Sequence, residues 1–118
     1  MEESILSTIK TMIGGFDDED TSFDTDLIIH INSVLMVIMQ EWYGMDDAVV
    51  IDKNTTWASV LGSDTNYEAV KSLVYLKVRM LFDPPTSQTL MQAMTDQIKD
   101  LEWRMYIWKD NERIDALT

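Results

Sequence analysis

The chain has 118 residues, of which 46% are hydrophobic, and it carries a net charge of −12 and no cysteine. This length and composition are typical of one folded domain, and the absence of cysteine excludes a disulfide scaffold and thiolate chemistry. The negative charge argues against a basic face for nucleic acid, and no apolar run reaches the ~20 residues of a membrane span.

The acidic side chains are concentrated in the first half. Residues 1–64 carry thirteen acidic and two basic side chains, a net charge of −11, whereas residues 65–118 carry eight acidic and seven basic side chains, a net charge of −1. The start of the chain is acidic and lacks the basic region of a signal peptide. We therefore expect an intracellular protein that does not bind DNA tightly.

Apolar residues at helical spacing predict a first, short helix over residues 5–13, which Gly14 and Gly15 end. The acidic segment that follows, residues 16–26, has carboxylates at the spacing of a calcium loop. However, Phe23 stands where that loop needs Gly, and Ile29 stands where it needs a bidentate Glu. We therefore expect a solvated loop without a metal, in which Phe23 packs on Ile28.

A second helix is predicted over residues 25–42, with apolar side chains on two faces. His30 is the only histidine, and no other His, Cys or Ser stands near it at the spacing of a metal site or a catalytic triad. No phosphate-binding glycine loop or other catalytic motif is present. We expect no enzymatic activity and no cofactor.

Residues 43–64 are predicted to be an irregular connection. Within it, residues 48–51 are compatible with a short strand or an extended segment, and residues 55–62 with a capped helical turn that Trp57 attaches to the core.

A long helix is predicted over residues 67–82, because this run contains no Gly or Pro and stops at Asp83-Pro84-Pro85. A further helix begins near Ser87 and continues to about Trp108 or beyond. Its inner stripe is apolar and comprises Leu90, Met94, Ile98, Leu101, Met105 and Trp108. The Pro-Pro corner makes these last two helices a hairpin. The predicted fold is all-α: a single domain over residues 1–118, a bundle of three to four helices, with residues 109–118 flexible until bound.

Five motifs occur in the order and spacing of a known family. They are Phe23-Asp24-Thr25-Asp26, His30-Ile31-Asn32, Thr55-Thr56-Trp57, the run from Lys77 to Ser87, and Leu101-Glu102-Trp103-Arg104. Over roughly residues 5–108 the chain resembles the head-to-tail connector (adaptor, or head completion) proteins of tailed bacteriophages and prophages.

The resemblance implies a structural virion protein at the junction of capsid and tail, present in the host cytoplasm during assembly. Such a protein forms a ring with copies of itself, dodecameric in the family. The ring docks on the portal protein, extends the DNA channel and binds the next neck or tail completion protein. DNA would pass through without sequence-specific binding. In the family a loop between long helices faces the channel, and the acidic connection is a candidate for it through Asp46, Asp47, Asp52 and Asp64.

The last helix also carries large apolar residues away from its inner stripe. With Leu101 pointing inward, Trp103 lies about 200° and Ile107 about 240° around the helix. Tyr106 lies at the edge of this face, and Ile114 extends it. We expect these four residues to form an interface with a partner, unless the first helix or the 43–64 connection covers them within the monomer.

The charge alone supports a second function, that of a small acidic binding module such as a DNA-mimicking inhibitor. Such a mimic spreads carboxylates along its helices, whereas residues 27–40 contain none. The connector function is therefore favoured.

Overall fold

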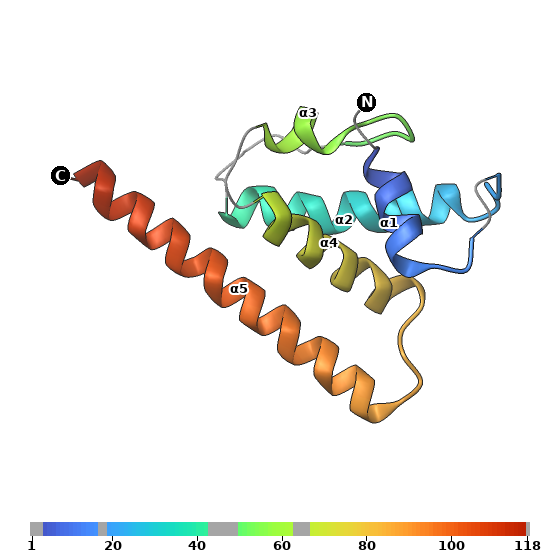
Figure 1. The fold of residues 1–118 in the computed structure, drawn as a ribbon. Coiled ribbons are helices and arrows are strands. Elements are labelled where there is room, and N and C mark those ends of the chain that lie inside the picture. Colours follow the sequence, from blue (N-terminus) through green and yellow to red (C-terminus); the bar gives the residue numbers. More distant parts are fainter. Residues whose placement is uncertain (1–3, 17–18, 43–49, 63–66, 118) are drawn as a thin grey trace.

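The structure is a computed structural model whose description covers residues 4–16, 19–42, 50–62 and 67–117, with side chains for all of these except residues 42, 67 and 111–117. These parts of the chain contain five helices and no strand. The helices are α1 (Ile5–Ile13), α2 (Asp24–Trp42), α3 (Trp57–Leu61), α4 (Tyr67–Phe82) and α5 (Gln88–Leu117) (Figure 1). The all-α prediction is confirmed.

Two short helices end and begin where local signals place them. The N–H of Gly14 donates to the Lys10 carbonyl at 3.0 Å, and the positive φ of Gly14, 81°, stops α1. At α3 the Thr56 side chain accepts a hydrogen bond from the Ser59 N–H, and Gly62 follows with a φ of 64°. The helix count exceeds the three to four expected because α3, anticipated as a single turn, has five helical residues. Val50 and Ile51, expected in a short strand or an extended segment, are not in a strand.

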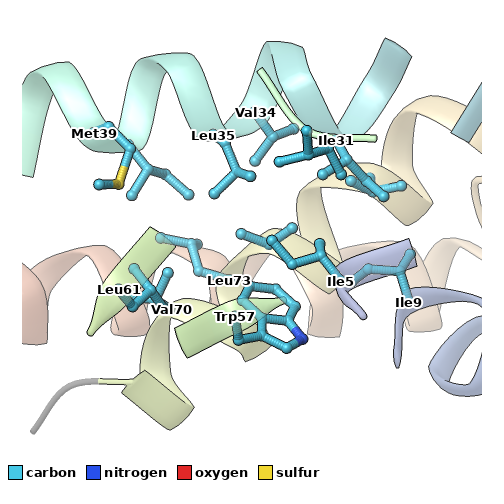
Figure 2. Packing of buried hydrophobic residues seen from close by; sticks show 14 of the residues in the cluster. Ile5, Ile9, Ile31, Val34, Leu35, Met39, Trp57, Leu61, Val70 and Leu73 are labelled. Carbon is cyan, nitrogen blue, oxygen red and sulfur yellow. The ribbon is translucent and has the colours of Figure 1, made fainter. Parts of the chain in front are cut away.

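The core lies between α2 on one side and α1, α3 and α4 on the other. In Figure 2, Ile31, Val34, Leu35 and Met39 of α2 face the buried side chains of these three helices. Trp57 is buried among them, as the sequence predicts. Its indole N–H donates a hydrogen bond of 3.0 Å to the Thr8 hydroxyl and so attaches α3 to α1.

The most enclosed helix is α4, because its apolar side chains cover most of its circumference. The buried ones are Val70, Leu73, Val74, Leu76 and Val78. Its polar line is narrow, and within it Arg79 Nη1 donates to the Tyr75 hydroxyl at 3.1 Å.

By contrast, α5 is attached along one side only. Met94 and Met105 are buried, and Ile98 and Leu101 pack partly against the core. Leu90, which the sequence placed on the inner stripe, is exposed, and so is Leu81 at the end of α4. The prediction for Leu90 is wrong because the connection after α4 carries the first turn of α5 away from the core (Figure 1). The helix continues to Leu117, through most of the segment for which flexibility was expected.

Candidate interaction surface

The outer side of α5 presents three large apolar side chains to solvent. Trp103, Tyr106 and Ile107 are 62%, 55% and 40% exposed, respectively. They lie opposite Met94 and Met105, whose burial fixes which side of α5 faces the body of the protein. We call Trp103, Tyr106 and Ile107 the α5 face. A cluster of exposed aromatic and aliphatic side chains on one helix is typical of an interface.

A shallow hollow of about 400 Å³ opens beside the α5 face. It is lined by Glu41, at the end of α2, and by Lys99, Glu102, Trp103 and Tyr106 of α5. The hollow therefore combines two aromatic rings with two carboxylates and one ammonium group.

Lys109 fixes the end of α2 against α5 next to this hollow. Its Nζ donates a hydrogen bond of 2.6 Å to the backbone carbonyl of Glu41. The last carbonyls of a helix have no partner within the helix, and a cation there also interacts favourably with the helix dipole. The contact thus satisfies the end of α2 and positions the α5 face relative to it.

Ion pairs hold the same stretch of α5 in place. Glu102 pairs with Lys77 of α4 at 3.2 Å, and both side chains are partly shielded from solvent. Arg104 pairs with Asp100 one turn away at 3.0 Å, but this pair is well exposed and contributes little to stability. The Lys77–Glu102 pair therefore links α5 to α4, whereas Arg104 remains accessible near the α5 face.

A second apolar surface lies at the opposite end of α2. All three phenylalanines of the chain, Phe16, Phe23 and Phe82, meet there, with ring centroids 5.5 to 6.2 Å apart. Phe23 is nevertheless 44% exposed. We call these three residues the phenylalanine corner. Phe16 and Phe82 reach Phe23 from the α1–α2 connection and the end of α4, and the expected packing of Phe23 on Ile28 stays a prediction.

Residues 5–112 match the model of the protein family described as phage connector protein. The chain belongs to this family. It is therefore a structural phage protein, associated with the virion and interacting with other head or tail proteins. Comparisons with curated proteins and with solved structures found no significant match.

The described part of this connector holds no cluster of three or more His, Asp or Glu side chains arranged to bind a metal. The ring of His30 instead lies edge-on to Phe82, with centroids 6.3 Å apart. In the described part of the chain, no helix combines the length and the apolar character of a membrane span.

Within the acidic segment between α1 and α2, carboxylates bind protein groups. Lys10 Nζ lies 2.9 Å from Asp24 Oδ1 and also donates to the backbone carbonyl of Asp20. The backbone N–H and the hydroxyl of Ser22 donate to the Asp20 carboxylate and lower its pKa. These contacts attach Asp20 and the start of α2 to Lys10 of α1, beside the phenylalanine corner.

Only Asp52 of the four predicted channel-facing residues belongs to the described part of the connector; Asp46, Asp47 and Asp64 lie outside it. The Asp52 carboxylate accepts hydrogen bonds from the Asn54 N–H at 2.8 Å and the Thr55 hydroxyl at 3.1 Å. These donors lower the pKa of Asp52, so it is ionised at neutral pH. Its position in the channel stays a prediction.

The four predicted interface residues all lie on α5, but they are not equally defined. Trp103 and Tyr106 share one hollow, and Ile107 lies one turn beyond Trp103 on the same side. The backbone of Ile114 continues the helix, and its side chain lies outside the description. Sequence reasoning missed Glu41, Lys109 and the phenylalanine corner. The one available signal was that all three phenylalanines stand beside predicted helix ends.

Proposed function

We propose that this connector forms the ring between the portal and the neck or tail of a phage. In this function it docks on the portal protein, extends the DNA channel and offers a surface to the next completion protein. The family membership supports a structural role in the virion. Ring formation, docking on the portal and the DNA channel go beyond what the family membership shows, and they are our proposal.

The α5 face is the observation that carries the proposal. Trp103 is 62% exposed in the monomer. It is well suited to anchor an interface, because a Trp that becomes buried on binding contributes a large apolar area and often dominates the binding energy. The α4–α5 hairpin proposed from the sequence would act as the support. The Lys77–Glu102 pair links α5 to α4, and the Lys109–Glu41 contact links α5 to the end of α2, on either side of Trp103 in the sequence.

The charge distribution supports a channel through which DNA passes without binding. Residues 1–64 have a net charge of −11, and Asp52 in this half is ionised at neutral pH. Carboxylates that line a channel repel phosphates and offer no cation to replace the counterions of DNA. We place the connection that contains Asp46, Asp47, Asp52 and Asp64 on the channel side.

The alternative function as a DNA mimic receives no support from α2, which is the longest helix in the acidic first half of the chain. Its carboxylates are Asp24 and Asp26 in the first turn and Glu41 in the last. A mimic of the phosphate backbone needs charges repeated along its length.

The test replaces the α5 face by polar residues of smaller size. The double variant Trp103→Ser/Ile107→Asn should keep the helix content and melting temperature of the wild type while losing ring assembly or portal docking. Val50→Asn is the matched control, because Val50 is 76% exposed and lies outside the α5 face. Normal assembly of the double variant, or its unfolding, would show that the α5 face is idle surface or core.

A further inference from the structure

A ring of identical subunits needs two different surfaces on each subunit, since a contact between the same patches closes a dimer. The α5 face is one of them. We propose that the other is the phenylalanine corner, so that the α5 face of one copy packs on the phenylalanine corner of the next. This inference rests on the proposed function, because it assigns the self-contact of that ring.

The two surfaces lie at opposite ends of one helix. Glu41, which lines the hollow of the α5 face, is in the last turn of α2, whereas Phe23 immediately precedes its first residue. Eighteen residues separate Phe23 from Glu41, a span of about 27 Å at the helical rise of 1.5 Å per residue. A subunit whose two apolar surfaces lie at opposite ends can bind one neighbour through each surface, so that all subunits are arranged head to tail.

The two surfaces also match in chemistry. Phe23 presents an exposed ring that Phe16 and Phe82 support from behind, with centroids at 6.0 and 5.5 Å. The hollow of the α5 face is lined by the rings of Trp103 and Tyr106. When the aromatic side chain of Phe23 enters a hollow lined by the aromatic side chains of Trp103 and Tyr106, it buries apolar surface and also makes edge-to-face contacts.

Charge disfavours a contact between two phenylalanine corners. The described residues beside the phenylalanine corner include four acidic side chains, Glu19, Asp20, Asp24 and Asp26, and one cation, Lys10, whose Nζ lies 5.6 Å from the Phe16 ring centroid and 2.9 Å from Asp24 Oδ1. Two such corners facing each other would repel. Residues 95–110, around the α5 face, contain four acidic and three basic side chains, and the accessible Arg104 is among them. The α5 face, with Glu41 and Glu102 in its hollow, is also slightly acidic, but Lys99 and Arg104 are exposed there, so a corner meets more accessible cations on an α5 face than on a second corner.

Crosslinking between introduced cysteines tests the pairing directly, because the natural chain has none. Thr25→Cys places a thiol beside the phenylalanine corner, and Asp100→Cys places one beside the α5 face; both positions are exposed. The probe is the full-length protein itself, treated with a short bismaleimide. The control pair is Asp100→Cys with Ser59→Cys, an exposed position on α3.

We expect the Thr25→Cys/Asp100→Cys double variant to form a ladder of dimers, trimers and larger species. Mixing the two single variants should give dimers only, and each single variant alone, like the control pair, should stay at the background level. Crosslinking of either single variant with itself would indicate a symmetric dimer and overturn the pairing. Background crosslinking of the double variant would overturn it as well.

A substitution separates this inference from the proposed function. Phe23→Ser should abolish self-assembly as completely as Trp103→Ser/Ile107→Asn, with folding checked by helix content, and Val50→Ser should assemble normally. If Phe23→Ser assembles while the α5 variant does not, the ring contact uses another second surface and the proposed function stands. If purified virions lack the protein at the neck, the proposed function itself fails.

Discussion

The hydroxyl of Thr8 joins two separate helices in the core, because it accepts the indole N–H of Trp57 at 3.0 Å and donates to the Ser4 carbonyl at 2.9 Å. Thr8 is the one buried polar residue in the described part of the chain. The N–H of Ile5 also donates to the Thr55 carbonyl at 2.9 Å. Together these bonds hold α1 and α3 against each other at the start of the core.

Thr8→Val should therefore destabilise the protein although it keeps the shape of the side chain. It removes the hydroxyl that accepts the buried indole N–H, at a cost of about 1–3 kcal/mol in the free energy of unfolding. Thr8→Ser is the matched control: it keeps the hydroxyl and loses one methyl group, worth about 0.8 kcal/mol. Urea denaturation of the three proteins measures both effects. A Val variant as stable as the wild type would mean that the Thr8–Trp57 bond adds nothing.

Asn32 has a comparable role at the point where the chain returns from the end of α2. Its Oδ1 accepts the backbone N–H of Ile51 at 2.7 Å, and Ile51 is buried. Asn32→Ala should cost about 1–3 kcal/mol and speed amide exchange at Ile51, since the buried N–H loses its acceptor. Ser33→Ala, on an exposed position of the same helix, should change neither. Unchanged exchange at Ile51 in the Asn32 variant would contradict this role.

Local signals predicted the helices well because each helix end is encoded within a few residues. The positive φ of Gly14, the Thr56 cap and the stop before Pro84 all act on their own neighbourhood. The outward direction of Trp103 followed from the helical period alone. Contacts between distant segments could not be predicted in this way. Lys109 and Glu41 are 68 residues apart, and Phe82 reaches Phe23 only once α4 lies on α2.

Leu90 shows where periodicity misleads. Its spacing from Met94 places it on the inner stripe, yet it is exposed. The period of a helix fixes which side chains share a face, but not how far the partner helix extends along that face. The end of α4 and its connection decide this, and they are tertiary features.

Acid should weaken the turn at Asp52 in a defined pH range. The Asn54 N–H and the Thr55 hydroxyl lower the pKa of Asp52 in the folded protein below its ordinary value of 3.8. The stabilisation is thus fully present above about pH 4 and is lost as the pH falls through the lower, folded-state pKa. The difference in unfolding free energy between wild type and Asp52→Asn should be constant from pH 7 to 5 and shrink towards pH 3. A difference that grows on acidification would contradict the assigned donors.

Calcium should not bind the acidic segment before α2 with physiological affinity. Carboxylates at two positions of the calcium-loop register already bind protein groups, because Asp24 pairs with Lys10 and Asp20 accepts the Ser22 N–H. Phe23 and Ile29 also replace the turn Gly and the bidentate Glu that such a loop requires. Isothermal titration should give no binding heat beyond dilution, for the wild type and for Lys10→Met alike. Micromolar binding by either protein would refute the prediction.

Duplex DNA should not bind the isolated protein at physiological salt, even though we propose that DNA passes through its ring. Binding to DNA depends on Lys and Arg side chains that neutralise phosphates and release counterions. Here nine such residues face 21 acidic ones, and Lys10, Lys77 and Arg104 each pair with a carboxylate within the protein.

A gel shift at low micromolar protein and ~0.15 M salt should show only free DNA. The control is the same measurement at ~0.01 M salt, where the Debye length is about 30 Å and the repulsion between the acidic half and DNA reaches further, so that binding should be no stronger. A complex that forms at low salt and survives at physiological salt would reveal a basic face and would contradict a non-adhesive channel. If no complex forms under either condition, any hold on DNA in the virion has to come from partner proteins, because this subunit supplies no attraction.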